Sequence, residues 1–117
     1  MTTQELVTKL LDYIKKGQNV QAEQELYADD VVSFEQNGYS AKGKESVIAK
    51  TQAAMANVAE FHGGGVKETY VGADSFLLEF EMDMTPKNGE RKIAHELGFY
   101  KVKDGKIAEE YFFDKVL

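Results

Sequence analysis

The chain has 117 residues, of which 43% are hydrophobic and 29% charged, a composition that indicates one folded domain over residues 1–117 and excludes a disordered chain. Its fourteen basic and twenty acidic side chains give a net charge of −6, which repels nucleic acids and anionic membrane surfaces as partners. Cysteine is absent, no apolar run reaches the length of about 18 residues that a membrane span needs, and we expect a cytoplasmic protein.

Two helices are predicted at the start of the chain. Apolar residues recur at helical spacing in the first, with Thr2 or Thr3 as its cap and Lys15–Gly17 as its end: Leu6, Val7, Leu10, Leu11 and Ile14. Asn19 is the expected cap of a second, shorter helix that continues to Tyr27.

A strand over residues 31–36 and a turn at Asn37-Gly38 are predicted next, followed by a loop over residues 38–42. The sequence leaves open whether this loop gates a pocket. Gly43 then precedes a third helix over residues 44–57. Its predicted buried stripe consists of Val47, Ile48, Thr51, Ala54, Met55 and Val58.

The second half of the chain is predicted to be a sheet. After a loop at His62–Gly65 the hydrophobic period changes to two, which indicates strands near 66–71, 76–84, 91–102 and 107–115. Turn signals at Gly72–Asp74, Asn88-Gly89 and Asp104-Gly105 join them. Helices followed by a strand meander predict an α+β fold with a curved antiparallel sheet over the helices.

Two stretches carry a likeness to a known family. Residues 26–35 (LYADDVVSFE) and 100–114 (YKVKDGKIAEEYFFD) resemble the SnoaL-like and ketosteroid-isomerase-like branch of the nuclear-transport-factor-2-like superfamily. The resemblance implies a cone-shaped sheet with three N-terminal helices enclosing a pocket, a cystatin-like roll. It also implies a homodimer through the convex sheet face and no cofactor.

Strand alternation and the family's orientation of the last strand identify the residues that face the pocket. The inward set on the last three strands is Leu78, Phe80, Met82, Met84, Ala94, Glu96, Gly98, Tyr100, Ala108, Glu110, Phe112 and Asp114. Tyr13 and Met55 are expected to line the pocket from the helices. An apolar wall of this kind suits a small apolar or aromatic ligand.

Carboxylates are the candidate catalytic groups. Glu35 lies eight residues after Tyr27, where the resemblance places the proton-transferring carboxylate of ketosteroid isomerases. Among Met55, Phe80 and Met82 its carboxylate would lose hydration, which raises its pKa toward the near-neutral value that favours proton transfer by a general base. Glu110 and Asp114 match the acid–base position that the resemblance to SnoaL-like cyclases implies.

The resemblance to ketosteroid isomerases lacks their oxyanion hole. Gly98 occupies the aspartic acid position and Gln52 replaces a tyrosine of the third helix, so only Tyr13, or a protonated Glu96, remains to donate a hydrogen bond. The epoxide-hydrolase pattern needs an arginine, and the single arginine, Arg91, is expected at the rim.

No metal site is predicted, because His62 and His95 are 33 residues apart with no ligand spacing around them. The His62–Gly65 segment resembles an esterase oxyanion loop, but the chain has no Gly-x-Ser-x-Gly nucleophile turn, and the glycines are expected to ease a bend.

The sequence therefore predicts a SnoaL-like cyclase or isomerase that transfers protons through carboxylates. The alternative is a non-catalytic ligand-binding or protein-interaction module in which the acids are structural. Tyr111 and Phe113 are expected to face outward, where a second subunit of a homodimer would cover them.

Overall fold

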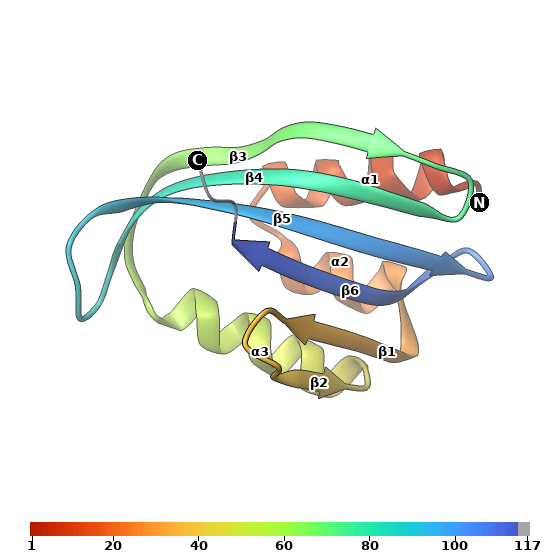
Figure 1. The fold of residues 1–117 in the computed structure, drawn as a ribbon, viewed down its shortest axis with the longest axis horizontal. Coiled ribbons are helices and arrows are strands. Elements are labelled where there is room, and N and C mark those ends of the chain that lie inside the picture. The colour runs from red at the N-terminus through yellow and green to blue at the C-terminus, as the bar shows by residue number, and fades with distance from the viewer. Residues whose placement is uncertain (115–117) are drawn as a thin grey trace.

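The computed structural model describes residues 1–114, which form three helices and a six-stranded sheet (Figure 1). In chain order the elements are α1 (Thr3–Lys15), α2 (Asn19–Leu26), β1 (Tyr27–Glu35), β2 (Ser40–Lys42), α3 (Lys44–Ala56), β3 (Val58–Val71), β4 (Ser75–Pro86), β5 (Lys92–Lys103) and β6 (Lys106–Asp114). The strand order is β2-β1-β6-β5-β4-β3, and β1 runs parallel to β6 while every other pair is antiparallel. The predicted α+β fold with a curved sheet is confirmed, and the parallel pair makes that sheet mixed.

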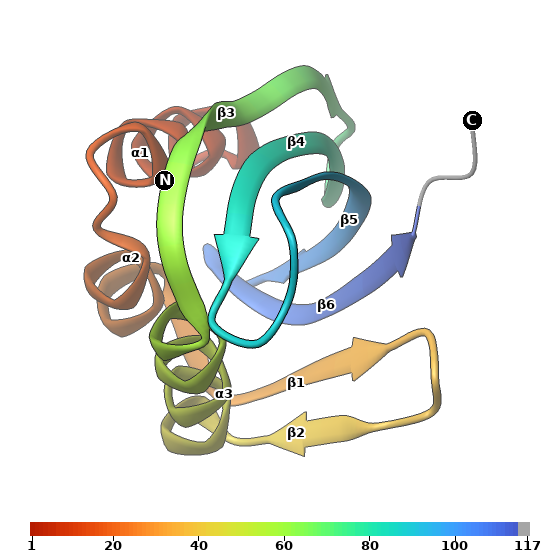
Figure 2. The same ribbon diagram turned by 90° about the vertical axis from the view of Figure 1, so that its left-hand side faces the viewer.

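The sheet curls so that the three helices lie along its concave side (Figure 2). The core lies in that curl and draws its fully buried side chains from all layers: Leu6, Val7, Leu26, Val31, Val47, Phe76, Leu78 and Ile107. Among the described residues, no helix is long and apolar enough to cross a membrane.

The helix ends show which predicted caps are used. Thr2 caps α1 in a capping box, because its hydroxyl accepts from the Glu5 amide while the Glu5 carboxylate accepts from the Thr2 amide. The prediction for α2 was wrong by one residue: Gln18 is the N-cap, and Asn19 is the first helical residue, so its side chain does not cap. The Asn19 amide oxygen is instead buried without a hydrogen-bond partner.

Only part of the predicted stripe of α3 is buried. Val47 is fully buried, but Ala54 and Met55 are exposed, because the end of this helix borders a cavity rather than the packed core. Val58 is not helical and begins β3.

Two predicted loops are strands. Residues 40–42 form β2, which pairs with β1 after the Asn37-Gly38 turn, so this part of the segment considered as a gate is held in the sheet. Residues 62–65 lie inside β3, which starts eight residues earlier than the strand predicted from Val66. Gly64 explains the difference: its φ is 114°, and a Cβ there would lie 2.0 Å from the carbonyl oxygen of Glu81, so only glycine lets the strand bend and stay paired.

The last hairpin sets the inward face of β6. Its predicted turn is confirmed, with Asp104 and Gly105 at φ values of 52° and 75°. Ala108, however, does not face inward. The pairing passes from Val102↔Ile107 to Lys101↔Glu109, so Ala108 is the extra residue of a β-bulge, and Ile107 takes the buried position instead. After the bulge Glu110 and Phe112 face inward as expected.

Candidate functional site

A cavity of about 1180 Å³ lies between the concave side of the sheet and the helices. Its walls are largely apolar and come from α1 and β4 on opposite sides: Leu10, Leu11 and Ile14, and Phe80, Met82 and Met84. Four glutamates and one interior lysine also line it: Glu23, Glu35, Glu96, Glu110 and Lys50. An apolar hollow with a few convergent polar groups is the usual form of a small-molecule site.

Glu110 is the deepest of these acids, with 2% of its surface exposed. The hydroxyl of Tyr27 donates a short hydrogen bond to its Oε1, and the hydroxyl of Ser33 donates to its Oε2 at 2.7 Å. Burial raises the pKa of Glu110, while the hydrogen bonds from Ser33 and Tyr27 oppose that shift. The carboxyl group is thus fixed in one orientation by β1.

Lys50 of α3 is the cation of the cavity. Its Nζ lies 2.8 Å from Glu35 Oε1, 2.5 Å from Ser33 Oγ and 3.9 Å from Glu110 Oε2. The same ammonium lies 4.9 Å from the centre of the Phe112 ring. One lysine therefore links the two acids that were predicted to share a hollow, Glu35 and Glu110.

Glu96 is the acid without a fixed partner. It is partly buried on β5, and among residues 1–114 no side chain donates a hydrogen bond to it or forms an ion pair with it. Burial, together with the charges of Glu35 and Asp114, raises the pKa of Glu96 to about 7. Its direct neighbour across the β4–β5 pair is Phe80.

Tyr100 brings a hydroxyl back toward Glu96. The two residues flank Gly98 on the same face of β5, and a Cβ on Gly98 would lie only 2.9 Å from the Tyr100 hydroxyl oxygen. The phenol therefore lies over Gly98, on the side of Glu96, where its ring stacks on Phe76 at 4.6 Å. This hydroxyl has no hydrogen-bond partner among the described residues. Gly98, expected to mark a lost acid, provides the space for this hydroxyl.

The model of the SnoaL-like domain family matches residues 1–114. The chain belongs to this family. A solved structure from Mesorhizobium loti, described as a SnoaL-like polyketide cyclase, is 40% identical, with a TM-score of 0.89 over 97% of this chain and 99% of that one. No curated protein matches the chain.

More distant structures share the fold of this SnoaL-like domain. One from Jannaschia sp. CCS1, described as a SnoaL-like polyketide cyclase, is 16% identical, with a TM-score of 0.81 over 95% of this chain and 83% of that one. One with a ketosteroid isomerase-like fold from Catenulispora acidiphila, in complex with trimethylamine, is 18% identical, with a TM-score of 0.77 over 98% and 88% of the two chains.

The predicted site residues of the SnoaL-like domain fall into two groups. The larger group lines the cavity: Glu35, Met55, Phe80, Met82, Glu96, Tyr100, Glu110 and Phe112. Met55 does so at the mouth, where 47% of its surface is exposed.

Four predicted residues lie elsewhere. Leu78 is fully buried in the core, and Gly98 lies beneath Tyr100 and Phe80, so packed side chains separate both from the cavity. Tyr13 packs partly buried against the core without lining the cavity, and its hydroxyl donates to Glu25 of α2 at 3.0 Å, so it is no oxyanion donor. Asp114 is exposed and its amide donates to Gln36, although its charge still acts on Glu96.

Arg91 lies outside the cavity, as expected of a rim residue. Its guanidinium binds both carboxylate oxygens of Asp83, at 3.0 and 2.9 Å, across the β4–β5 hairpin. This ion pair leaves the arginine no role in the cavity.

Sequence reasoning missed Lys50 and Glu23 because both are charged residues on helices. A signal was present: Lys50 lies three residues after the buried Val47, and Glu23 three residues before the buried Leu26, so each shares the inward face of its helix. Glu23 is 6% exposed, and its Oε2 accepts from the Thr51 hydroxyl at 2.5 Å. Burial raises the pKa of Glu23 to about 7, against the opposing effect of the Thr51 hydrogen bond.

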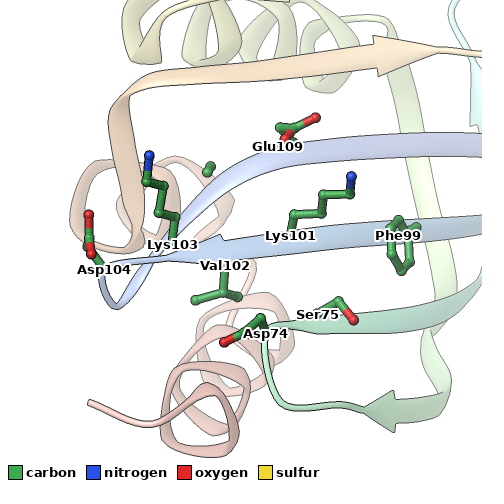
Figure 3. Close-up of a pocket in the computed structure, with 9 residues that line it drawn as sticks. Asp74, Ser75, Phe99, Lys101, Val102, Lys103, Asp104 and Glu109 are labelled. Carbon is green, nitrogen blue, oxygen red and sulfur yellow. The ribbon is translucent and has the colours of Figure 1, made fainter.

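A second hollow of about 600 Å³ lies on the convex side, near the start of β4 and the β5–β6 turn (Figure 3). Its edge carries exposed charged side chains, among them Asp74, Lys101 and Lys103. It lacks the buried acids and apolar walls of the cavity, so the cavity is the candidate site of this SnoaL-like domain.

Proposed function

We propose that the protein is a cofactor-independent isomerase or cyclase that moves a proton next to a carbonyl group of a small, largely apolar substrate. The observation that carries the proposal is the Tyr100 hydroxyl, an unpartnered donor that lies over Gly98 beside Glu96. A base and a hydrogen-bond donor on one side of an apolar cavity are the two groups that enolate chemistry requires.

Glu96 is the proposed base. A carboxylate with a pKa of about 7 both accepts a proton from the carbon next to a carbonyl and returns it near neutral pH. In the first step the C–H bond breaks, the proton goes to Glu96, and the electron pair moves to the carbonyl oxygen. Tyr100 stays protonated, because burial and the charges of Glu110 and Glu96 raise its pKa, and its O–H donates to that oxygen.

The two reaction classes differ only in the second step. If Glu96 returns its proton to another carbon of the enolate, the product is an isomer. If the enolate carbon attacks a second carbonyl of the same substrate, a carbon–carbon bond forms and the product is a ring. The proton then goes from Glu96 to the new alkoxide oxygen.

The remaining acids serve as positioning residues in this proposal. Glu35 and Glu110 hold Lys50 between them, and the charge of Glu35 contributes to the raised pKa of Glu96. Asp114 acts on the same pKa from the end of β6. Glu96 thus replaces Glu35 as the first candidate for proton transfer, because Lys50 already neutralises Glu35.

Exchange of a carbon-bound proton tests the proposal without knowledge of the natural substrate. The probe is 2-tetralone, an apolar ketone whose exchange in D₂O is followed by proton NMR. We expect saturable exchange whose rate rises with pH through about 7, because the carboxylate form of Glu96 is the active one. Glu96→Gln lowers the rate by roughly 100-fold or more and Tyr100→Phe by roughly tenfold or more.

Glu109→Gln is the matched control, since Glu109 lies on β6 next to Glu110 but outside the cavity. It leaves exchange unchanged. Exchange that persists at the wild-type rate in Glu96→Gln contradicts the proposal.

The second candidate is a ligand-binding module without turnover. The Catenulispora structure, whose fold this chain shares, contains trimethylamine, so a protein of this fold holds a small molecule. Under this alternative 2-tetralone binds, with shifts of the Phe80 and Tyr100 resonances, but its protons do not exchange faster than in buffer.

A further inference from the structure

The cavity has a second polar region, distinct from the Lys50 network, at the N-terminal turn of α2. Asn19 and Glu23 are four residues apart on this helix and so lie on one face of it. Both line the cavity. Asn19 Oδ1 and Glu23 Oε1 are the buried side-chain atoms of residues 1–114 that have no hydrogen-bond partner.

When Glu23 is ionised, both unpartnered atoms are acceptors, so the missing group is a donor. Buried polar atoms without a partner cost about 1–3 kcal/mol each, and they are uncommon in folded proteins unless a ligand or water completes them. The nearby hydroxyl of Thr51 is already engaged, because it donates to the other oxygen of Glu23. Lys50 donates to Ser33 and Glu35, and it makes no hydrogen bond to Asn19 or Glu23.

Charge selects among the donors. Four carboxyl groups and one interior ammonium line the cavity, and that ammonium is shared by Glu35 and Glu110. Lys15 and Lys16 also border the cavity, but both are exposed to solvent and Lys16 is paired with Asp12. An anionic ligand would add to this imbalance. A protonated amine supplies N–H donors together with the compensating charge, and a buried carboxylate is stabilised by both.

We propose that the Asn19–Glu23 pair is an ammonium-binding subsite, so that the ligand is an apolar compound carrying a protonated amine. This inference deepens the proposed function, since it makes the substrate an amine-bearing carbonyl compound. The amine donates to Glu23 Oε1 and Asn19 Oδ1, and the apolar body occupies the space in front of Leu10, Leu11 and Phe80.

Three probes that share a 2-phenylethyl body test the subsite. They are 2-phenylethylamine, 2-phenylethanol and 3-phenylpropanoate, and their affinities are measured by calorimetry or NMR titration at pH 8. We expect the amine to bind at least tenfold more tightly than the alcohol, and the carboxylate to bind more weakly than both.

Variants on α2 assign the effect to the subsite. Glu23→Gln preserves the shape of the side chain and removes the charge, so the preference for the amine over the alcohol falls at least tenfold. Glu25→Gln, on the same helix, removes an exposed carboxylate that binds Lys9 and Tyr13, and it leaves the preference unchanged. Melting curves of both variants verify that they fold.

Equal binding of amine and alcohol, an amine that does not bind, or a preference that survives Glu23→Gln each overturns the subsite. The first result would mean that Glu23 carries a proton that it donates to Asn19, and the last that another acid of the cavity holds the amine. Exchange of 2-tetralone depends on Glu96 and not on Glu23, so it persists if only the subsite is wrong. If the proposed function alone is wrong, the amine preference persists and the exchange is absent.

Discussion

Glu109 and Glu110 are neighbours on β6, and each accepts a hydrogen bond from a tyrosine, yet they lie on opposite faces of the sheet. Glu110 points into the helix-covered side, where Tyr27 donates to it and only 2% of it is exposed. Glu109 lies on the convex side, where it is partly exposed to solvent and accepts a hydrogen bond from the hydroxyl of Tyr111. A tyrosine–glutamate hydrogen bond is thus part of the core on one face of the sheet and lies at the surface on the other.

The difference shows that the surroundings, not the residue types, determine what a carboxylate can do in this sheet. On the concave side, burial is the largest cause of the raised pKa of Glu23, Glu96 and Glu110. On the convex side, Tyr111 stacks on Phe34 at 4.7 Å and meets the tilted ring of Phe99 at 6.2 Å, and Glu109 keeps part of its surface exposed. Chemistry is therefore expected on the concave face and assembly on the convex one.

The largest expected effect comes from deleting the two neighbouring acids in turn. Glu110→Ala leaves the hydroxyls of Tyr27 and Ser33 without their acceptor and opens a void, so we expect the free energy of unfolding to fall by roughly 3–4 kcal/mol. Glu109→Ala changes it by less than about 0.5 kcal/mol. Urea denaturation measures both, and similar losses for the two variants would break the comparison.

A smaller effect is expected from the charge of Glu23, and it depends on pH. The pKa of Glu23 is raised from 4.5 to about 7 in the folded protein, so folding favours its protonated form. Its favourable contribution is present below about pH 4.5 and is lost as the pH rises through 7. At pH 8 the ionised, buried group costs on the order of 3 kcal/mol at most, at about 1.4 kcal/mol per pH unit.

Glu23→Gln removes that cost, so it stabilises the protein at pH 8 and has little effect at pH 5. Thermal unfolding at the two pH values measures the difference. Glu25→Gln, with its exposed carboxylate, serves as the control and shows no such change between the two pH values. A Glu23→Gln variant that is equally stabilised at both would contradict the raised pKa.

Gly98→Ala sharpens the comparison within β5. The added Cβ meets the Tyr100 ring and hydroxyl at 2.9 Å and Phe80 at 3.1 Å, so these rings must shift. We expect a loss of roughly 1–3 kcal/mol in unfolding free energy. Exchange of 2-tetralone falls as well, because the hydroxyl leaves its place beside Glu96. Full exchange activity in a folded Gly98→Ala variant would contradict the role assigned to Tyr100.

The smallest effect on stability is expected on the convex face. Phe113 is 45% exposed there and lies directly across from Leu97 of β5. We predict that a second copy of the chain covers this surface. Phe113→Lys changes the unfolding free energy by less than about 0.5 kcal/mol but converts a dimer into a monomer. Light scattering measures this, and Tyr39→Lys, at the exposed β1–β2 turn, is the control. A monomeric wild-type protein would remove the prediction.

Much of the fold could be predicted from the sequence, because local patterns determine it. Leu6, Val7 and Leu10 mark the buried face of α1, and Asp104-Gly105 encodes the last turn. The first errors came where pairing partners decide the structure. Residues 40–42 have no strand pattern of their own and become β2 by pairing with β1. Ala108 faces outward because of a bulge that depends on its partner strand.

The candidate site could be predicted only in part. Strand alternation, together with the orientation of the last strand that the family resemblance implies, selected Glu96, Tyr100 and Glu110 as residues of one face, since side chains two apart share a side of the sheet. Only the tertiary structure decided that Lys50 neutralises Glu35, that the Tyr100 hydroxyl reaches over Gly98, and that Glu23 is buried. Burial and charge pairing join residues from different elements, and so the pKa of each acid is a property of the folded cavity and not of its sequence neighbours.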